Sequence, residues 1–273
     1  MTDSEASPPI ELVISDCDGT LFDPSKEVTP RAKRAVEALR SKGIRFTLSS
    51  SRPPSGIASA AAYLEVSEPM GTCNGAAVVD ASLVPIVQHC LEPADVVLAV
   101  QILTAHSVDA WAYSASGWWV TDASNPHVPK EARNLRLEPT VVSTDRLPQH
   151  AILKIVGVCD DVTVVRSARA AIKEQLDDRV HAECSQDYYL DVTSSKVSKG
   201  TCVEEISRLT NVDQAAIAVL GDGHNDVAMF AAAGLSIAMG QSDETVRSAA
   251  DHVTTSNADE GFARAIEQLI IPR

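Results

Sequence analysis

The sequence is poor in the features that mark membrane and secreted proteins. None of its apolar stretches approaches the roughly 20 residues needed to span a bilayer. The first nine residues contain Asp3 and Glu5 but no Lys or Arg, so they lack the basic start of a secretory signal. We therefore expect a cytoplasmic protein with no membrane partner.

Basic residues and paired cysteines are also scarce. The chain has 23 Lys and Arg against 37 Asp and Glu, a formal net charge of -14, which disfavours a nucleic-acid partner because that requires a basic footprint. The six cysteines show no Cys-x-x-Cys spacing, so we expect reduced packing thiols rather than disulfides or zinc ligands. On so acidic a chain, any phosphate site must be made locally cationic by Lys, Arg, backbone N–H groups or a metal.

What the sequence does contain is ordinary for a globular enzyme. Hydrophobic residues make up 45% of the chain and charged residues 22%. A length of 273 residues suits one large or two modest domains.

Both ends of the chain show strand and helix patterns in alternation. Ile10–Ile14 is an apolar strand; Thr29 and Pro30 begin a helix that ends by Gly43; and Ile44–Ser49 is the next strand. The alternation returns with a strand over 215–220, a helix over 227–233 and a strand over 235–239. Such β-α-β order predicts an α/β fold whose core domain is a Rossmann-like parallel sheet.

The middle of the chain has a different pattern and predicts an inserted α+β domain over 83–192, which leaves 1–82 and 193–273 for the core. Within the insert we expect helices over 93–106 and 162–176 and a loop through Pro126, Pro129, Pro139 and Pro148. The expected strands cover 108–113, 117–121, 151–158, 180–184 and 188–192. We expect most of the insert's aromatic residues to pack its sheet, with one of Trp118 and Trp119 as a candidate substrate contact because neighbours on a strand face opposite sides.

Two aspartates one residue apart, Asp16 and Asp18, directly follow the first strand. The carboxyl ends of strands are where open α/β sheets bind ligands, and residues two apart on a strand face the same side. Close carboxylates repel one another, so the pair needs a shared proton or a cation, most naturally Mg2+.

Three further pieces suggest phosphate chemistry. Ser50 and Arg52 follow the second strand and offer a hydroxyl and a fork-shaped cation. Lys199 opens a helix, where its charge is unfavourable unless an anion lies there too. Asp222 and Asp226 follow the strand over 215–220, and Asp222 is the natural further carboxylate for Mg2+.

Together these pieces resemble the four motifs of the haloacid dehalogenase superfamily of phosphatases. More narrowly, the chain resembles the Cof-like branch, in which a large α/β cap is inserted between the second and third motifs. The residues that carry the resemblance are Asp16-Cys17-Asp18-Gly19-Thr20-Leu21, Ser50, Lys199, Gly221-Asp222-Gly223-His224-Asn225-Asp226 and the segments 72–76, 249–254 and 256–261. One departure is Ser51, where the branch commonly has Gly before Arg.

The resemblance implies a role for each residue. Asp16 is the nucleophile that becomes an aspartyl phosphate, and Asp18 is the general acid and then the general base. Mg2+ is held by Asp16, the backbone carbonyl of Asp18 and Asp222, with Asp226 completing or orienting the shell. The expected phosphate-binding residues are Ser50, Lys199 and Asn225, and the expected contacts with the leaving group are Arg52 and Asn74.

The sequence thus predicts a Mg2+-dependent phosphomonoesterase acting on a small phosphorylated metabolite, with a sugar phosphate favoured. A phosphomutase or a specialised sugar-conjugate phosphatase is the alternative among enzymes. Outside enzymes, the alternative is a protein that binds a phosphometabolite without turnover.

Overall fold

The computed structural model describes residues 8–272, which form two compact units. One, here called the core unit, runs to Ser51, takes in Ile57–Leu83 and resumes at Ser198. The other, called the insert unit, comprises Arg52–Gly56 and Val84–Val197. Each unit has its own sheet and its own apolar cluster.

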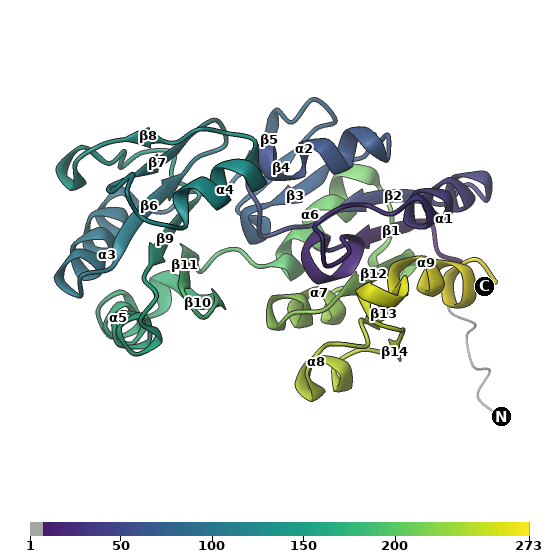
Figure 1. The fold of residues 1–273 in the computed structure, drawn as a ribbon. Coiled ribbons are helices and arrows are strands. Elements are labelled where there is room, and N and C mark those ends of the chain that lie inside the picture. The colour runs from purple at the N-terminus through teal and green to yellow at the C-terminus, as the bar shows by residue number, and fades with distance from the viewer. Residues whose placement is uncertain (1–7, 273) are drawn as a thin grey trace. The chain divides into compact units, whose positions relative to one another are not determined.

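The core unit is built on a five-stranded sheet with the order β14-β13-β12-β1-β2 (Figure 1). All four neighbouring pairs are parallel. The strands are β1 Leu12–Ser15, β2 Arg45–Leu48, β12 Ile217–Gly221, β13 Leu235–Ala238 and β14 His252–Val253. The predicted α/β class with a parallel-sheet core is confirmed.

Helix α1 (Pro30–Ser41) shows how local sequence sets this architecture. The Thr29 side chain accepts a hydrogen bond from the backbone N–H of Ala32, and Pro30 occupies the first helical position, where its missing N–H costs nothing. Apolar residues then recur on one buried face of the helix, including Val36 and Leu39. The predicted start of this helix is confirmed.

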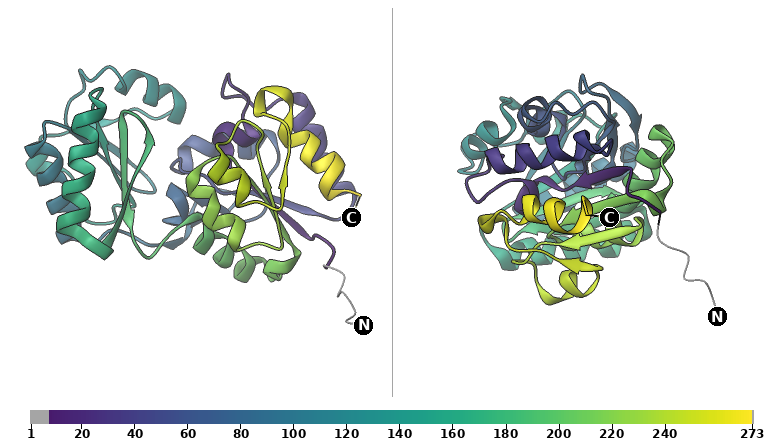
Figure 2. Two further views of the ribbon diagram at one scale, coloured as in Figure 1. Left: turned by 90° about the horizontal axis from the view of Figure 1, so that it is seen from below. Right: turned by 90° about the vertical axis from the view of Figure 1, so that its right-hand side faces the viewer.

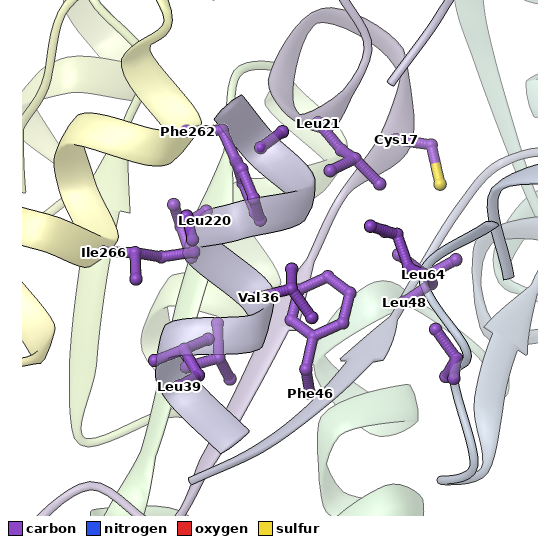
Figure 3. Packing of buried hydrophobic residues seen from close by; sticks show 14 of the residues in the cluster. Cys17, Leu21, Val36, Leu39, Phe46, Leu48, Leu64, Leu220, Phe262 and Ile266 are labelled. Atoms are coloured by element: carbon purple, nitrogen blue, oxygen red, sulfur yellow. The ribbon is translucent and has the colours of Figure 1, made fainter. Parts of the chain in front are cut away.

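The main core cluster lies where α1 and α9 (Gly261–Ala265) meet the sheet (Figure 3). Phe46 of β2 and Phe262 of α9 pack edge to face with their ring centroids 5.9 Å apart. Val13 joins this cluster, whereas its neighbours Leu12 and Ile14 are buried on the opposite face of the same strand. Both faces of β1 are therefore covered, as the central strand of a parallel sheet requires.

The remaining elements of the core unit are short. Figure 2 shows helices along both sides of its sheet. They include α6 Lys199–Thr210, α7 Val227–Ala231 and α8 Glu244–Ser248. Two strands, β3 Met70–Thr72 and β4 Ala77–Val79, form an antiparallel pair, and α2 spans Pro54–Tyr63.

The insert unit has a six-stranded sheet with the order β10-β11-β9-β6-β7-β8. Helices α3 (Pro93–Ala105) and α5 (Val162–Leu176) pack on one face through an apolar cluster. The strands are β6 Asp109–Tyr113, β7 Trp118–Val120, β8 Thr140–Val141, β9 Lys154–Val158, β10 Val180–Gln186 and β11 Tyr189–Ser194; a further strand, β5, spans Pro85–Gln88. The expectation of helices on one side of the strands holds for α3 and α5, but it is wrong for α4 (Val128–Leu135), which packs on the opposite face.

The expected loop through the proline-containing stretch was wrong in part. Residues Val128–Leu135 form helix α4, and Thr140–Val141 pairs with β7 as β8. Pro129 lies in the first turn of α4, a position that tolerates proline, and only Val128 and Leu135 of this helix are buried. Val128, Ala132 and Leu135 recur at helical spacing on the packed side of this helix, a signal that the expectation of a loop passed over.

The aromatic residues of the insert mostly pack its sheet, as expected. Trp111, Tyr113 and Trp118 are buried together, whereas Trp119 is partly buried against the cluster on the other face. In the part of the chain that the structure describes, no helix combines the length and apolar character that crossing a membrane demands.

The role of Thr29 as the N-terminal cap of α1 can be tested by substitution. We expect Thr29→Ala to lower the free energy of unfolding by about 1 kcal/mol, because a backbone N–H of α1 loses its acceptor. The hydroxyl also donates to Glu260 Oε2 at 2.7 Å. Thr29→Ser keeps the hydroxyl and should stay close to wild type in urea denaturation; equal losses for both variants would contradict the capping role.

Candidate active site

The site lies where three neighbouring parallel strands of the core unit end. Asp16 follows β1, Ser50 comes two residues after β2, and Asp222 follows β12. Because β12, β1 and β2 are adjacent and parallel, the loops that follow them emerge at the same edge of the sheet. Residues far apart in the chain are thereby brought to one place.

Lys199, the first residue of α6, lies between two of the aspartates at this edge of the sheet. Its ammonium nitrogen is 2.6 Å from Asp16 Oδ1 and 2.6 Å from Asp226 Oδ1. Its side chain is only 1% exposed, so both ion pairs are shielded from water. A buried ammonium is stable only when opposite charges compensate it, and here two carboxylates do so.

Asp226 ties this lysine to the loop after β12. Its second oxygen, Oδ2, accepts hydrogen bonds from the backbone N–H groups of Asp222 and Gly223, each at 2.9 Å. The close approach requires glycine at 221, where an added Cβ would lie 2.4 Å from the Cβ of Asp226. Asp226 therefore fixes both the loop that carries Asp222 and the position of Lys199.

Asp222 completes a group of three carboxylates. Asp16, Asp222 and Asp226 each offer an oxygen, and these oxygens lie within 4.8 Å of one another. Two residues that the sequence interpretation missed contact Asp222: the Thr20 hydroxyl donates to Oδ1 at 3.4 Å, and the Gln241 amide donates to Oδ2 at 3.4 Å. Gln241 also donates to the carbonyl oxygen of Gly19 at 2.6 Å. Thr20 lies within the quoted motif, whereas nothing in the sequence marks Gln241.

The crowding of charge changes how the carboxylates titrate. Burial raises the pKa of Asp16 well above its usual range; Lys199 opposes this rise, whereas Asp226 and Asp222 add to it. Burial and then Asp226 raise the pKa of Asp222 to about 6. Burial alone would lower the pKa of Lys199, but Asp16 and Asp226 outweigh it and raise that pKa instead.

These features fit a hard divalent cation. Three carboxylates face one ammonium, which leaves two negative charges uncompensated. All the ligand atoms on offer are oxygens, the donors that Mg2+ prefers. Burial and then repulsion from Asp226 raise the pKa of Asp222, and a bound cation would offset both.

Asp18 is placed differently from the other acidic residues. The strand ends at Ser15, and Asp18 lies in the tight turn that follows, beside Gly19 with φ of 80°. Its carboxylate pairs with the Lys26 ammonium at 2.8 Å, and its side chain is 29% exposed. The carboxylate of Asp18 is thus more accessible than that of Asp16, which suits a group that exchanges protons.

Ser50, Asn74 and Asn225 are linked to one another. The carbonyl oxygen of buried Ser50 accepts from the backbone N–H of Asn74 at 2.9 Å. Asn74 has φ of 59°, a left-handed conformation that Asn tolerates, and its Oδ1 accepts from Asn225 Nδ2 at 2.9 Å. The structure therefore brings a predicted phosphate-binding residue and a predicted substrate-binding residue into direct contact.

Arg52 is grouped with the insert unit rather than with the core unit. Its guanidinium donates to the carbonyl oxygens of Gly56 at 3.3 Å and Asn134 at 3.4 Å. Its expected role toward a leaving group stays a prediction.

Comparison with known proteins agrees with this geometry. The chain belongs to the haloacid dehalogenase-like hydrolase family, whose sequence model matches residues 13–266. A solved haloacid dehalogenase-like hydrolase from Bacteroides thetaiotaomicron has the same fold, with a TM-score of 0.86 at 23% identity over 95% of this chain and 99% of the other. The resemblance inferred from the motifs is confirmed.

Curated relatives carry phosphatase names. The 5-amino-6-(5-phospho-D-ribitylamino)uracil phosphatase YcsE of Bacillus subtilis is 21% identical over 264 residues, 96% of each chain. The pyridoxal phosphate phosphatase YbhA of Escherichia coli is 24% identical over 272 residues, 95% of this chain and 98% of the relative. The prediction of an enzyme of the phosphatase class is confirmed.

Gly19 offers a test of how tightly the turn and Asp222 fit. A Cβ at this residue would lie 2.1 Å from Asp222 Oδ2, so we expect Gly19→Ala to displace that carboxylate and reduce catalytic turnover by at least about tenfold. Gly43→Ala is the matched control, because Gly43 also has positive φ, 77°, but nothing within 4 Å of an added Cβ. Both variants should lose stability in thermal melts, but equal turnover in the two would contradict the clash.

Proposed function

We propose that this protein is a Mg2+-dependent phosphomonoesterase that acts through an aspartyl-phosphate intermediate. The observation that carries the proposal is the buried Asp16 carboxylate, held by Lys199 beside Asp222 and Asp226. An ion-paired carboxylate of this kind is fixed in position, and its neighbours are the charges that phosphoryl transfer needs.

The residues that would hold Mg2+ are Asp16, Asp222 and the backbone carbonyl of Asp18. When bound, the cation neutralises charge so that an anionic carboxylate and an anionic phosphate can approach. Both oxygens of Asp226 already accept hydrogen bonds, from Lys199 and from two backbone N–H groups, which favours an orienting role for this residue.

The chemistry assigned to the side chains has two steps. An oxygen of Asp16 attacks phosphorus, the bond from phosphorus to the ester oxygen breaks, and Asp18 donates its proton to the leaving alkoxide. Asp18 then takes a proton from water, whose oxygen attacks phosphorus and releases Asp16 and inorganic phosphate. Ser50, Lys199 and Asn225 would bind the transferring oxygens as their charge redistributes.

For the substrate, we propose a small phosphorylated metabolite, with a sugar phosphate favoured. The two named relatives act on a phosphorylated ribityl compound and on pyridoxal phosphate, both small phosphomonoesters. We propose residues 83–192 as the cap that selects the leaving group. We also propose that Arg52 and Asn74 contact the leaving group.

The nucleophile can be tested by Asp16→Asn. This isosteric change removes the attacking oxygen anion, so phosphate release from a panel of phosphomonoesters with Mg2+ should fall at least about 1,000-fold. Asp187→Asn makes the same change at an exposed turn and should leave release unaltered. Product analysis accompanies the assay: phosphate retained on carbon would indicate a mutase, and substantial release by Asp16→Asn would rule out the assigned nucleophile.

Metal removal tests the carboxylate cluster. We expect EDTA to abolish phosphate release, excess Mg2+ to restore it, and Ca2+ to restore little, because Ca2+ is larger and takes more ligands at longer distances. Thermal melts in EDTA control for unfolding. Full turnover in EDTA would contradict the metal requirement.

A further inference from the structure

Gln241 lies in the loop after β13 and contacts three other loops of the core unit. Its side-chain amide nitrogen donates to the carbonyl oxygen of Gly19 at 2.6 Å and to Asp222 Oδ2 at 3.4 Å. Its side-chain oxygen accepts from the backbone N–H of Asn257 at 3.1 Å. One exposed side chain therefore connects the turn after β1, the loop after β12 and the loop after β14.

The backbone that carries Gln241 is anchored on both sides. The guanidinium of Arg247 in α8 donates to the carbonyl oxygen of Ser242 at 2.8 Å and to that of Gly240 at 3.4 Å. The backbone N–H of Gly240 donates in turn to the carbonyl oxygen of Thr255 at 3.1 Å. The side chain of Gln241 therefore reaches out from a fixed backbone, which lowers the entropy that its own contacts must overcome.

The carboxylate of Asp222 has a neutral donor beside each oxygen. The Thr20 hydroxyl lies at Oδ1 and the Gln241 amide at Oδ2, each at 3.4 Å. Of the three clustered carboxylates only Asp222 is not buried, so repulsion from Asp16 and Asp226 would turn this one outward most easily. Each carboxylate oxygen can accept more than one contact, so these donors orient Asp222 and still leave room for a cation.

The shorter contact of Gln241 fixes the turn after β1. Gly19 has φ of 80°, and a glycine changes its backbone conformation more easily than other residues. The bond from Gln241 to the Gly19 carbonyl oxygen holds this peptide group in one orientation. The preceding peptide group contains the carbonyl of Asp18, the backbone ligand proposed above for Mg2+. Gln241 thus contacts one proposed ligand directly and holds the peptide group next to another.

We propose that Gln241 is a positioning residue that holds Asp222 and the turn after β1 in place for a divalent cation. It acts through these two groups and does not bind the cation, because its amide oxygen faces the backbone of Asn257. Residues that orient metal ligands typically contribute about ten- to a hundredfold to metal affinity. The inference rests on the proposed function for the identity of the cation, Mg2+, but cation binding can be measured without substrate.

The test is Gln241→Met, which keeps the length of the side chain but removes its donor and its acceptor. Binding is measured without substrate from the electron paramagnetic resonance signal of free Mn2+, which prefers the same oxygen ligands as Mg2+. We expect the Mn2+ dissociation constant to rise about tenfold. The matched control is Gln214→Met, which removes a 2.8 Å bond to the carbonyl oxygen of Ala232 near the start of β12 and should leave the constant unchanged.

A positioning role also predicts how Mg2+ affects turnover. In Gln241→Met the Mg2+ concentration for half-maximal phosphate release should rise about tenfold, whereas kcat in saturating Mg2+ should stay within about twofold of wild type. Excess cation selects the correctly arranged ligands, but it would not repair a general structural defect. Thermal melts in EDTA check the fold, and Gln241→Ala, which removes the same bonds and leaves no long side chain, is used if Gln241→Met melts early.

The outcomes separate this inference from the proposed function. A wild-type Mn2+ dissociation constant in the Gln241 variant, an equal rise in Gln214→Met, or a loss of kcat that excess Mg2+ does not restore would overturn the positioning role. Wild type that binds Mn2+ but releases no phosphate from any phosphomonoester would overturn the proposed function and leave the binding comparison intact. Wild type that binds no Mn2+ would overturn both.

Discussion

The Lys199 ammonium is enclosed between Asp16 and Asp226, and the geometry of the site depends on this contact. Each distance is 2.6 Å, and the three side chains come from the loop after β1, the start of α6 and the loop after β12. Removing Lys199 would leave two buried carboxylates without a cation between them, a cost of several kcal/mol. The contact therefore couples three separate pieces of chain, and the core packing beneath them must hold all three in place.

This coupling explains why small residues surround the site. Gly221 makes room for Asp226, and Gly19 makes room for Asp222 while its φ of 80° turns the chain back after Asp18. Gly71 and Gly75 likewise lie against α6, where added Cβ atoms would meet Cys202 and Ser198. With these glycines, the backbone comes close enough for the short aspartate side chains to reach the ammonium of Lys199.

The sequence predicted those parts that depend on local pattern. Helix α5 spans Val162–Leu176 as expected. Asp16 and Asp222 follow β1 and β12, and they lie at the edge of the sheet where the carboxyl ends of these parallel strands meet. It did not predict α4, a short helix among several prolines, or the contact of Asn74 with Asn225, which are 151 residues apart. Lys199 was expected at a phosphate, and its pairing with Asp16 and Asp226 emerges only once α6 is packed against the sheet. Gln241 has no sequence signal because its role depends entirely on which loop lies opposite.

The two units use buried charge in opposite ways. In the core unit three carboxylates share one ammonium, so the cluster has an excess of negative charge that a divalent cation can match. In the insert unit the buried pair of Lys154 and Asp191 sets one cation against one carboxylate, so this pair calls for no further ion.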